Sequence, residues 1–215
     1  MARRLTWLLV VVSLLLWSGV ALAASYGEAP MLADKVKAGE LPPVEERLPV
    51  AEDIMVFEPV DGIGKYGGTL RMMHSSAGAA EIRMFLYDSF VRWALDYNGY
   101  IPGVFKDWEY NDDGTELTFH LRKGLKWSDG VPFTTADILF WWEDMAMNDD
   151  FADEPKPWWG FIDGSFKTSL VVIDEYTFKF VFESPNWNIP ATLAQGYWNY
   201  EPMMRPKHYL SQFHP

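Results

Sequence analysis

Three pairs of neighbouring carboxylates are the residues best suited to acid–base chemistry in this sequence. The pairs are Asp112/Asp113, Asp149/Asp150 and Asp153/Glu154. Two carboxylates can serve as the acid and base of a glycoside hydrolase when they face each other across the scissile bond. Residues adjacent in the chain seldom converge on one bond, so the pattern favours solvated turns. We expect no catalytic residue here, and a secreted glycan hydrolase stays as the alternative hypothesis.

The histidines offer a second kind of chemistry, metal binding. They are His74, His120, His208 and His214, and no pair has the HExxH spacing that places two imidazoles on one helix face. The sequence also lacks cysteine, a GxSxG nucleophile elbow and the common Gly-rich phosphate loops. We therefore predict no metal, no cofactor and no covalent catalysis.

Tryptophan can bind a solute without any reaction, because an exposed indole face stacks on sugar rings or peptide side chains. Trp141 and Trp142 lie at helical spacing with other apolar residues, which favours a place in a core. Trp158, Trp159 and Trp198 lie in sequence typical of loops and are the predicted ligand-stacking residues.

The N-terminus predicts export from the cytoplasm. Two arginines precede an apolar run over residues 5–16, and a small-x-small cleavage sequence ends at Ala23. The competing interpretation is a membrane anchor, but Ser18 and Gly19 interrupt the run before the roughly 20 apolar residues that an anchor needs. We predict a signal peptide over residues 1–23, cleaved near Ala23, and a periplasmic or extracellular product.

Composition limits the partners of the folded part. The 215 residues are 49% hydrophobic and 16% aromatic, which is enough to bury a sizeable core. Because there is no cysteine, neither disulfides nor a lipid-modified cysteine can contribute, and packing must stabilise the fold. The formal net charge of −12 argues against nucleic acid as a partner, since phosphate binding needs clustered Lys and Arg.

The elements that must position these residues begin with residues 24–64, called the lead below. Its prolines predict extended chain crossing a surface, with one short helix over residues 31–37 and Gly39 just past the end of that helix. Farther along, Gly67-Gly68 predicts a turn and residues 69–73 a strand. The spacing of apolar residues predicts a helix over residues 81–93.

Two later segments predict antiparallel strands. Residues 116–122 alternate, which places Leu117, Phe119 and Leu121 on one face and Thr118, His120 and Arg122 on the other. Residues 169–184 predict two strands around an Asp174-Glu175 turn, with Phe178, Phe180 and Phe182 on one face. Strands and helices alternate without strict βαβ order, so we predict a mixed fold, α+β or α/β.

The segment WSDGVPFTTADILFWWED, residues 127–144, is called the motif segment below. It predicts a turn at Ser128-Asp129-Gly130, then a helix capped by Thr134 or Thr135 with Asp137 in its first turn. Ile138, Trp141, Trp142 and Met145 form one apolar stripe along that helix. We assign structural roles to Trp127, Ser128, Asp129, Gly130 and Asp137.

Several strings of this sequence resemble one protein family. They are YGGTLR (66–71), LYDSFVRW (86–93), the stretch 101–144 and PKHYL (206–210), of which LTFHLRKGLKWSDGVPFTTADILF is the most specific. All are similar to the extracytoplasmic solute-binding proteins of family 5, the peptide, nickel and oligosaccharide receptors of ABC importers. The lead resembles a long-form branch of the same family.

The resemblance implies a fold like that of type II periplasmic binding proteins, with two lobes closing on a solute. It assigns residues 65–90 to the start of lobe I, 91–205 to a subdomain inserted in lobe I, and 206–215 to the return to lobe I; the second lobe is expected to be missing from this chain. It also implies that HSSAGAA, residues 74–80, lines the cleft. His74, Ser75 and Ser76 are therefore expected to contact ligand, and the competing interpretation is a connector of small residues.

The function that the resemblance implies is capture of oligopeptides for delivery to an ABC permease in the membrane. The abundant tryptophan makes oligosaccharide the alternative ligand, and a sensory binding module is a further alternative. A monomer that binds a small solute, and no nucleic acid, is expected.

Overall fold

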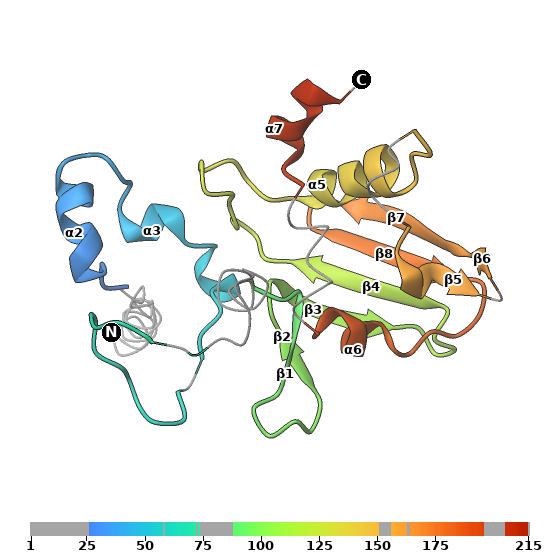
Figure 1. Ribbon diagram of the computed structural model, residues 1–215, viewed down its shortest axis with the longest axis horizontal. Coiled ribbons are helices and arrows are strands. Elements are labelled where there is room, and N and C mark those ends of the chain that lie inside the picture. Colours follow the sequence, from blue (N-terminus) through green and yellow to red (C-terminus); the bar gives the residue numbers. More distant parts are fainter. Residues whose placement is uncertain are drawn as a thin grey trace, which may run out of the picture.

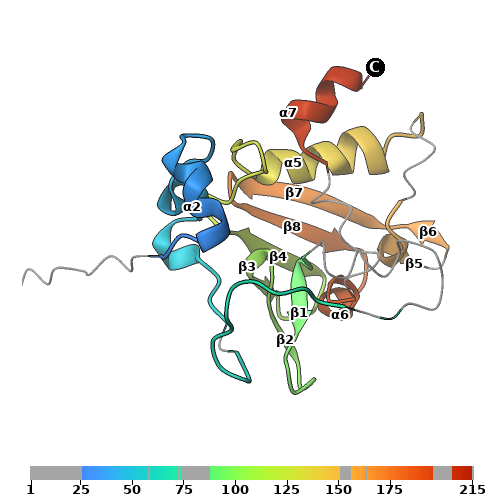
Figure 2. The same ribbon diagram turned by 60° about the vertical axis from the view of Figure 1, so that its left-hand side comes forward.

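A four-stranded antiparallel sheet forms the centre of the molecule (Figure 1). The computed structural model describes residues 26–57, 59–71, 73, 88–150, 156–162, 164–195 and 205–214. The lead lies at one end of the sheet, and a two-stranded hairpin projects away from the sheet (Figure 1 and Figure 2). The expected mixture of helices and strands is therefore present.

The described part of the lead contains three short helical elements. They are α2 (Pro30–Lys37), α3 (Val44–Arg47) and the 3₁₀ turn η1 (Ala51–Asp53). The predicted helix over residues 31–37 is confirmed as α2, and Gly39 follows it with a left-handed φ of 74°. Most of the lead is exposed, but Asp53 is buried with only 1% of its surface accessible.

The central sheet has the strand order β3-β4-β8-β7. Its strands are β3 (Phe105–Tyr110), β4 (Glu116–Leu121), β7 (Thr168–Asp174) and β8 (Thr177–Phe182). The alternation predicted for β4 is confirmed, because Leu117, Phe119 and Leu121 are buried on one face. Phe119 pairs with Phe178 across the β4–β8 ladder, so both phenylalanines point into the same core. The predicted pair of strands at residues 169–184 is confirmed as β7 and β8.

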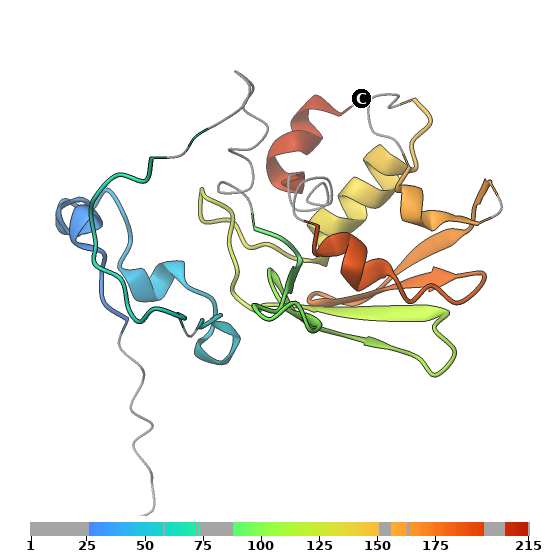
Figure 3. The same cartoon turned by 60° about the horizontal axis from the view of Figure 1, so that its bottom comes forward.

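The helices that follow cover the buried face of this sheet. They are α5 (Thr135–Phe140), which continues as the wider π-helical turn η2 (Trp141–Ala146), and α6 (Ile189–Leu193). Figure 3 shows α5 and α6 on the same side of the sheet. The smaller elements are η3 (Trp158–Gly160), β5 (Phe161–Ile162), β6 (Ser165–Phe166), α7 (Lys207–Leu210) and η5 (Ser211–Phe213).

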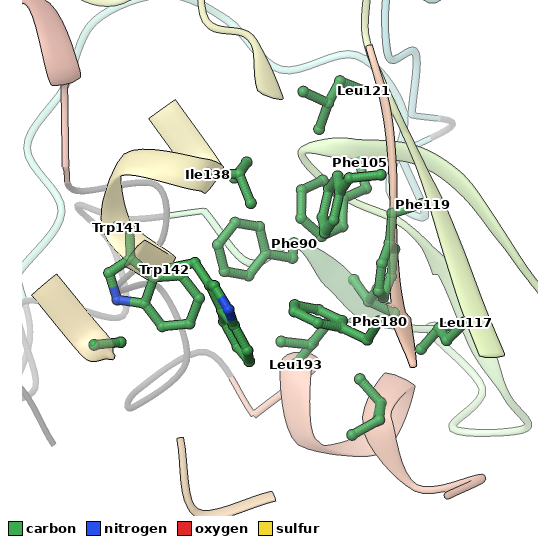
Figure 4. Close-up of a cluster of buried hydrophobic side chains, with 14 of the residues drawn as sticks. Phe90, Phe105, Leu117, Phe119, Leu121, Ile138, Trp141, Trp142, Phe180 and Leu193 are labelled. Carbon is green, nitrogen blue, oxygen red and sulfur yellow. The ribbon is translucent and has the colours of Figure 1, made fainter. Parts of the chain in front are cut away.

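Aromatic side chains fill the core between the sheet and these helices (Figure 4). Phe105 stacks on Phe90 with ring centroids 4.5 Å apart, and the Phe119 and Phe178 rings are 5.4 Å apart. Such aromatic pairs add to the free energy of burial through their preferred geometries. The stripe on α5 and η2 enters this core, as the sequence predicts: Ile138, Trp141, Trp142 and Met145 are all buried.

The helix predicted over residues 81–93 is wrong for its last residues, 91–93. Val91–Trp93 is the strand β1, which pairs with β2 (Tyr100–Pro102) as a hairpin. The carbonyl of Phe90 accepts hydrogen bonds from the amides of Gly103 and Phe105, so the backbone is committed to pairing with a neighbouring segment. This tertiary pairing outweighs the helical spacing. Residues 81–87 lie outside the described residues.

The strand predicted over residues 69–73 is also wrong at its described positions, 69–71 and 73. No strand forms there, and Leu70 and Met73 are exposed. A strand needs a neighbour to satisfy its amides and carbonyls, and within the described ranges no other strand pairs with this segment. Gly67 and Gly68 have the left-handed φ values of 100° and 83°, but the structure has only a bend at Tyr66 and no turn at the two glycines.

Candidate functional site

The motif segment begins with a tight turn closed by its own backbone. The amide of Gly130 donates to the carbonyl of Trp127 at 2.9 Å, and the amide of Trp127 donates to Val131 at 2.8 Å. Gly130 has φ 91°, where a residue with a Cβ would be strained. The carboxylate of Asp129 accepts the amide of Val131, which fixes the turn from inside. Ser128 is exposed on this turn.

The helix that follows starts with a complete capping box. The Thr134 hydroxyl accepts the amide of Ala136, and the Asp137 carboxylate accepts the amide of Thr134 at 3.0 Å. Of the two caps that the sequence allows, Thr134 is therefore the one used. The Thr135 hydroxyl instead donates to the carbonyl of Asp174 at 2.8 Å, which ties the helix start to the end of β7.

The motif segment also binds the segment PKHYL. The second oxygen of Asp137 accepts the amide of Lys207 at 2.9 Å, and Asp129 forms a 2.7 Å hydrogen bond with His208 Nε2. The hydrogen bonds from His208 and from the Val131 amide lower the pKa of Asp129 below its usual value. Two motif carboxylates therefore position α7.

The predicted ligand-stacking residues have different outcomes. Trp159 is half-buried; its ring lies edge-on to Phe180 with centroids 4.8 Å apart and 6.4 Å from Trp142. Trp158 belongs to the η3 turn. Trp198 lies outside the described residues, as do His74, Ser75 and Ser76. The structure thus joins Trp159 to the edge of the core, and ligand contact by all six residues stays a prediction.

The carboxylate pairs behave as turn residues where the structure describes them. Asp113 accepts the amide of Thr115 at 3.0 Å and also bonds its hydroxyl, and these bonds lower the pKa of Asp113. Asp149 pairs with Lys156. Asp153 and Glu154 lie outside the described residues. Within the described ranges, no three His, Asp or Glu side chains come together in a way that could hold a metal ion.

Sequence reasoning missed a buried charge cluster at the junction of lead and sheet. Asp53 pairs with Lys106 at 2.5 Å and accepts the amide of Lys123 at 2.7 Å. Burial alone would raise the pKa of Asp53, but the bonds from Lys106 and Lys123 lower it overall. Nothing in the local sequence separates Asp53 from the exposed acids beside it, because its burial depends wholly on the sheet.

Arg122 belongs to the same cluster and corrects a prediction. The alternation of residues 116–122 predicts that Arg122 lies on the polar, solvent-facing side of the strand. In the structure its side chain is buried, with only 7% of its surface exposed. Its guanidinium donates to the carbonyls of Gly103 and Asp53 at distances of 2.8–3.1 Å. Burial lowers the pKa of this guanidinium, an effect that the nearby carboxylate of Asp53 opposes. Arg122 lies just past β4, where the alternation of the strand no longer sets its direction.

Two of the hollows on the described surface adjoin the lead. A polar one of about 430 Å³ lies beside the cluster and is lined by Asp53, Lys106, Asp107, His120, Leu121, Lys123, Asp174, Glu175, Tyr176 and Thr177. In it, His120 Nε2 lies 3.7 Å from a carboxylate oxygen of Asp107. A more apolar one of about 620 Å³ lies between the lead and the β1–β2 hairpin, where the Arg92 guanidinium sits 4.5 Å from the Phe57 ring centre.

These features match a known class of protein. Residues 99–207 match the family model described as "Bacterial extracellular solute-binding proteins, family 5 Middle". The chain therefore belongs to the family 5 solute-binding proteins, and its mixed α/β fold is that of the type II-like periplasmic binding proteins. The resemblance identified from the motif segment is thereby confirmed. Proteins of this family bind solutes and are not classed as enzymes.

Individual proteins of known function or structure are also similar to this chain. A periplasmic alpha-galactoside-binding protein from Rhizobium meliloti (strain 1021) is 33% identical over 88% of this chain, and the Escherichia coli (strain K12) dipeptide-binding protein is 28% identical over 52%. A solved structure titled oligopeptide-binding protein OppA is 36% identical over 90% of the chain with a TM-score of 0.75. That of MelB from Agrobacterium fabrum C58, in complex with stachyose, is 28% identical over 89% with a TM-score of 0.59.

The matched region is a minor part of each relative. The chain spans 30% of the length of the alpha-galactoside-binding protein, and 29% and 31% of the two solved chains. Within the described residues, none of the helices is both long and apolar enough to cross a membrane.

Proposed function

We propose that this chain is part of the extracytoplasmic receptor of an ABC importer, which captures a small solute and delivers it to a membrane permease. The observation that carries the proposal is the family match over residues 99–207, which contains the motif segment and its hydrogen bond to the amide of Lys207. Two lobes that close around the solute would supply the mechanism, with no covalent step. Export by the signal peptide would place the receptor in the periplasm or outside the cell.

The ligand class that we propose first is an oligosaccharide of the α-galactoside type. Of the relatives described above, three extend along about nine tenths of the chain, and two of these carry an α-galactoside or stachyose in their names or titles. Those two matches cover 88% and 89% of the chain, whereas the match to the dipeptide-binding protein covers 52%. Stacking on indole faces suits such a ligand.

Oligopeptide is the second candidate, and a specific observation favours it as well. The chain titled oligopeptide-binding protein OppA has the higher identity and TM-score of the two solved structures. The sequence alone put this ligand first. The two classes make different demands, because a peptide needs partners for its charged ends and its amides, whereas a sugar needs hydroxyl partners and stacking faces.

Calorimetric titration of the complete gene product with stachyose and with di- to pentapeptides separates the two classes. Heat with stachyose alone supports the sugar receptor, and heat with peptides alone supports the second candidate. In the sugar case, Trp159→Ala should weaken binding about three- to tenfold through the lost stacking. Trp187→Ala is the matched control, because Trp187 is 54% exposed and its ring contacts Tyr110 in a tilted arrangement, with centroids 4.8 Å apart. A protein that binds neither class, with no permease genes nearby, would refute the proposal.

A further inference from the structure

One stretch of the lead, residues 46–53, runs along the turn that joins β4 to the motif segment; it is called the strap below. At its start, the carbonyl of Glu46 accepts a hydrogen bond from the Lys126 ammonium. In its middle, the amide of Val50 donates to the carbonyl of Lys123 at 2.9 Å. At its end, the carboxylate of Asp53 accepts the amide of Lys123 at 2.7 Å. The strap and the turn are therefore joined along their length by hydrogen bonds, and each of the two segments supplies both donors and acceptors.

The last residue of the strap is inserted between charged partners. Asp53 is 1% exposed, its carboxylate pairs with Lys106, and its main-chain carbonyl accepts the guanidinium of Arg122 at 2.8 Å. A carboxylate removed from water in this way costs free energy unless it is paired and hydrogen-bonded. Here one carboxylate oxygen forms the ion pair with Lys106 and the other accepts the amide of Lys123, so the two charged and polar partners offset the cost of burial.

The turn is shaped to receive the strap at Gly124. A Cβ added there would lie 3.2 Å from the amide nitrogen of Val50 and 3.5 Å from Pro49, so a side chain would press on the strap. Gly124 also has φ 78°, where other residues are strained. By contrast, a Cβ at Gly130 would meet nothing within 4 Å, although its φ of 91° is also left-handed. Gly124 therefore serves both the turn and the close approach of the lead.

We propose that residues 46–53 are a fastening strap, and that Arg122, Lys123 and Gly124 of the family-like string LTFHLRKGLKWSDG form the built seat that receives it. In this chain the string thus has a second role besides shaping its own turn: it anchors the N-terminal lead to the sheet. Just beyond the strap, Phe57 then lies beside Arg92 of the hairpin, so the same fastening holds one wall of the apolar hollow.

Hydrogen exchange of individual amides in the full chain tests the strap directly. In Asp53→Ala, the Lys123 amide loses its acceptor and the Lys106 pair is lost, so the Val50 and Lys123 amides should exchange about tenfold faster or more. Glu52→Ala is the matched control, because Glu52 is an exposed acid in the same 3₁₀ turn. It should leave both amides as they are in the parent chain.

A second pair of variants tests the seat. Gly124→Ala and Gly130→Ala both introduce a Cβ at a left-handed φ, but only the first meets the strap. The Val50 amide should exchange faster in Gly124→Ala alone. Equal exchange at Val50 in Asp53→Ala, Gly124→Ala and their controls would overturn the proposal.

A third variant covers the case in which Asp53→Ala does not fold. Lys106→Ala removes the same ion pair from its exposed end, since the Lys106 side chain is 39% exposed. Faster exchange of the Lys123 amide in that variant supports the strap. Unchanged exchange there would overturn it.

Discussion

Asp137 joins two segments that lie seventy positions apart, because one of its carboxylate oxygens accepts the amide of Thr134 while the other accepts the amide of Lys207 at 2.9 Å. The first bond completes the cap of α5, and the second positions the segment that carries α7. A single buried side chain therefore does two structural tasks, and both need acceptor oxygens.

Replacing Asp137 with alanine should lower the free energy of unfolding by about 2–3 kcal/mol, the sum of a lost cap and a lost buried hydrogen bond. Urea unfolding of the full chain measures this change. Glu143→Ala, on the exposed side of the following helical turn, should change stability by less than about 0.5 kcal/mol. Equal losses in the two variants would show that the cap does not contribute.

Trp142 should contribute to stability as a core residue. It is 6% exposed and packs against Trp141, Phe166 and Phe180. Trp142→Ala should cost about 3–5 kcal/mol, through the lost burial and the cavity left behind. Trp187→Ala removes a half-exposed indole and should cost about 1 kcal/mol. Chemical denaturation distinguishes the two, and a small loss for Trp142 would contradict the core assignment.

Acid should release the strap. The pKa of Asp53 in the folded chain is below its ordinary value because Lys106, Lys123 and Arg122 favour the carboxylate over the opposing effect of burial. Its contribution to stability is therefore complete above the ordinary carboxyl pKa of about 4 and is lost as pH falls through the lower folded value. The pKa of Lys106 is raised by the bond to Asp53, so the pair loses strength at the basic end only above the ordinary lysine value.

The measurement is the exchange protection of the Val50 amide from pH 6 down to pH 3, corrected for the intrinsic dependence of exchange on pH. Protection should fall toward the acid end in the parent chain. Asp53→Asn cannot titrate and should show a flat profile. Parallel profiles would mean that other groups, such as Glu52 or Asp107 near Lys106, control the release.

The signal peptide is open to a direct check. The exported product should begin at or just after residue 24, since cleavage is predicted near Ala23. Intact-mass measurement of protein recovered from the periplasm or medium gives the new N-terminus. Ala23→Leu should slow processing, and a mass that retains residues 1–23 in the unaltered chain would favour a membrane anchor instead.

Local chemistry made much of the motif segment predictable. The Gly130 turn, the cap on α5 and the stripe through Trp142 depend on residues within a few positions of one another, and each has a familiar sequence pattern. The alternation of β4 was predictable for the same reason. The second bond of Asp137 was not, because its partner is set by how the later chain packs.

Long-range pairing explains the failures. The helical spacing that ends at Trp93 is real, but Phe90 is fully buried against Phe105, and Val91 begins a strand that pairs with Tyr100–Pro102. Asp53 lies in a sequence that is typical of a surface turn. It is buried because the fold places Arg122 and Lys106, which are distant in the sequence, against it. Of the predicted ligand residues, Trp159 alone has a described side chain, and single-residue spacing could not show that its ring would pack on Phe180.

The wide turn η2 carries one more consequence. A π-helical turn contains one residue more than an α-helix needs to reach the same next contact, as though a residue had been slipped into a regular helix. Residues 141–146 therefore include one residue more than a regular α-helical continuation of α5 would need. Removing one residue there would leave Thr134 and Asp137 in place, convert the turn to regular α-helix and preserve the contacts of the residues that follow, so this turn is where the helix tolerates a change of one residue in length.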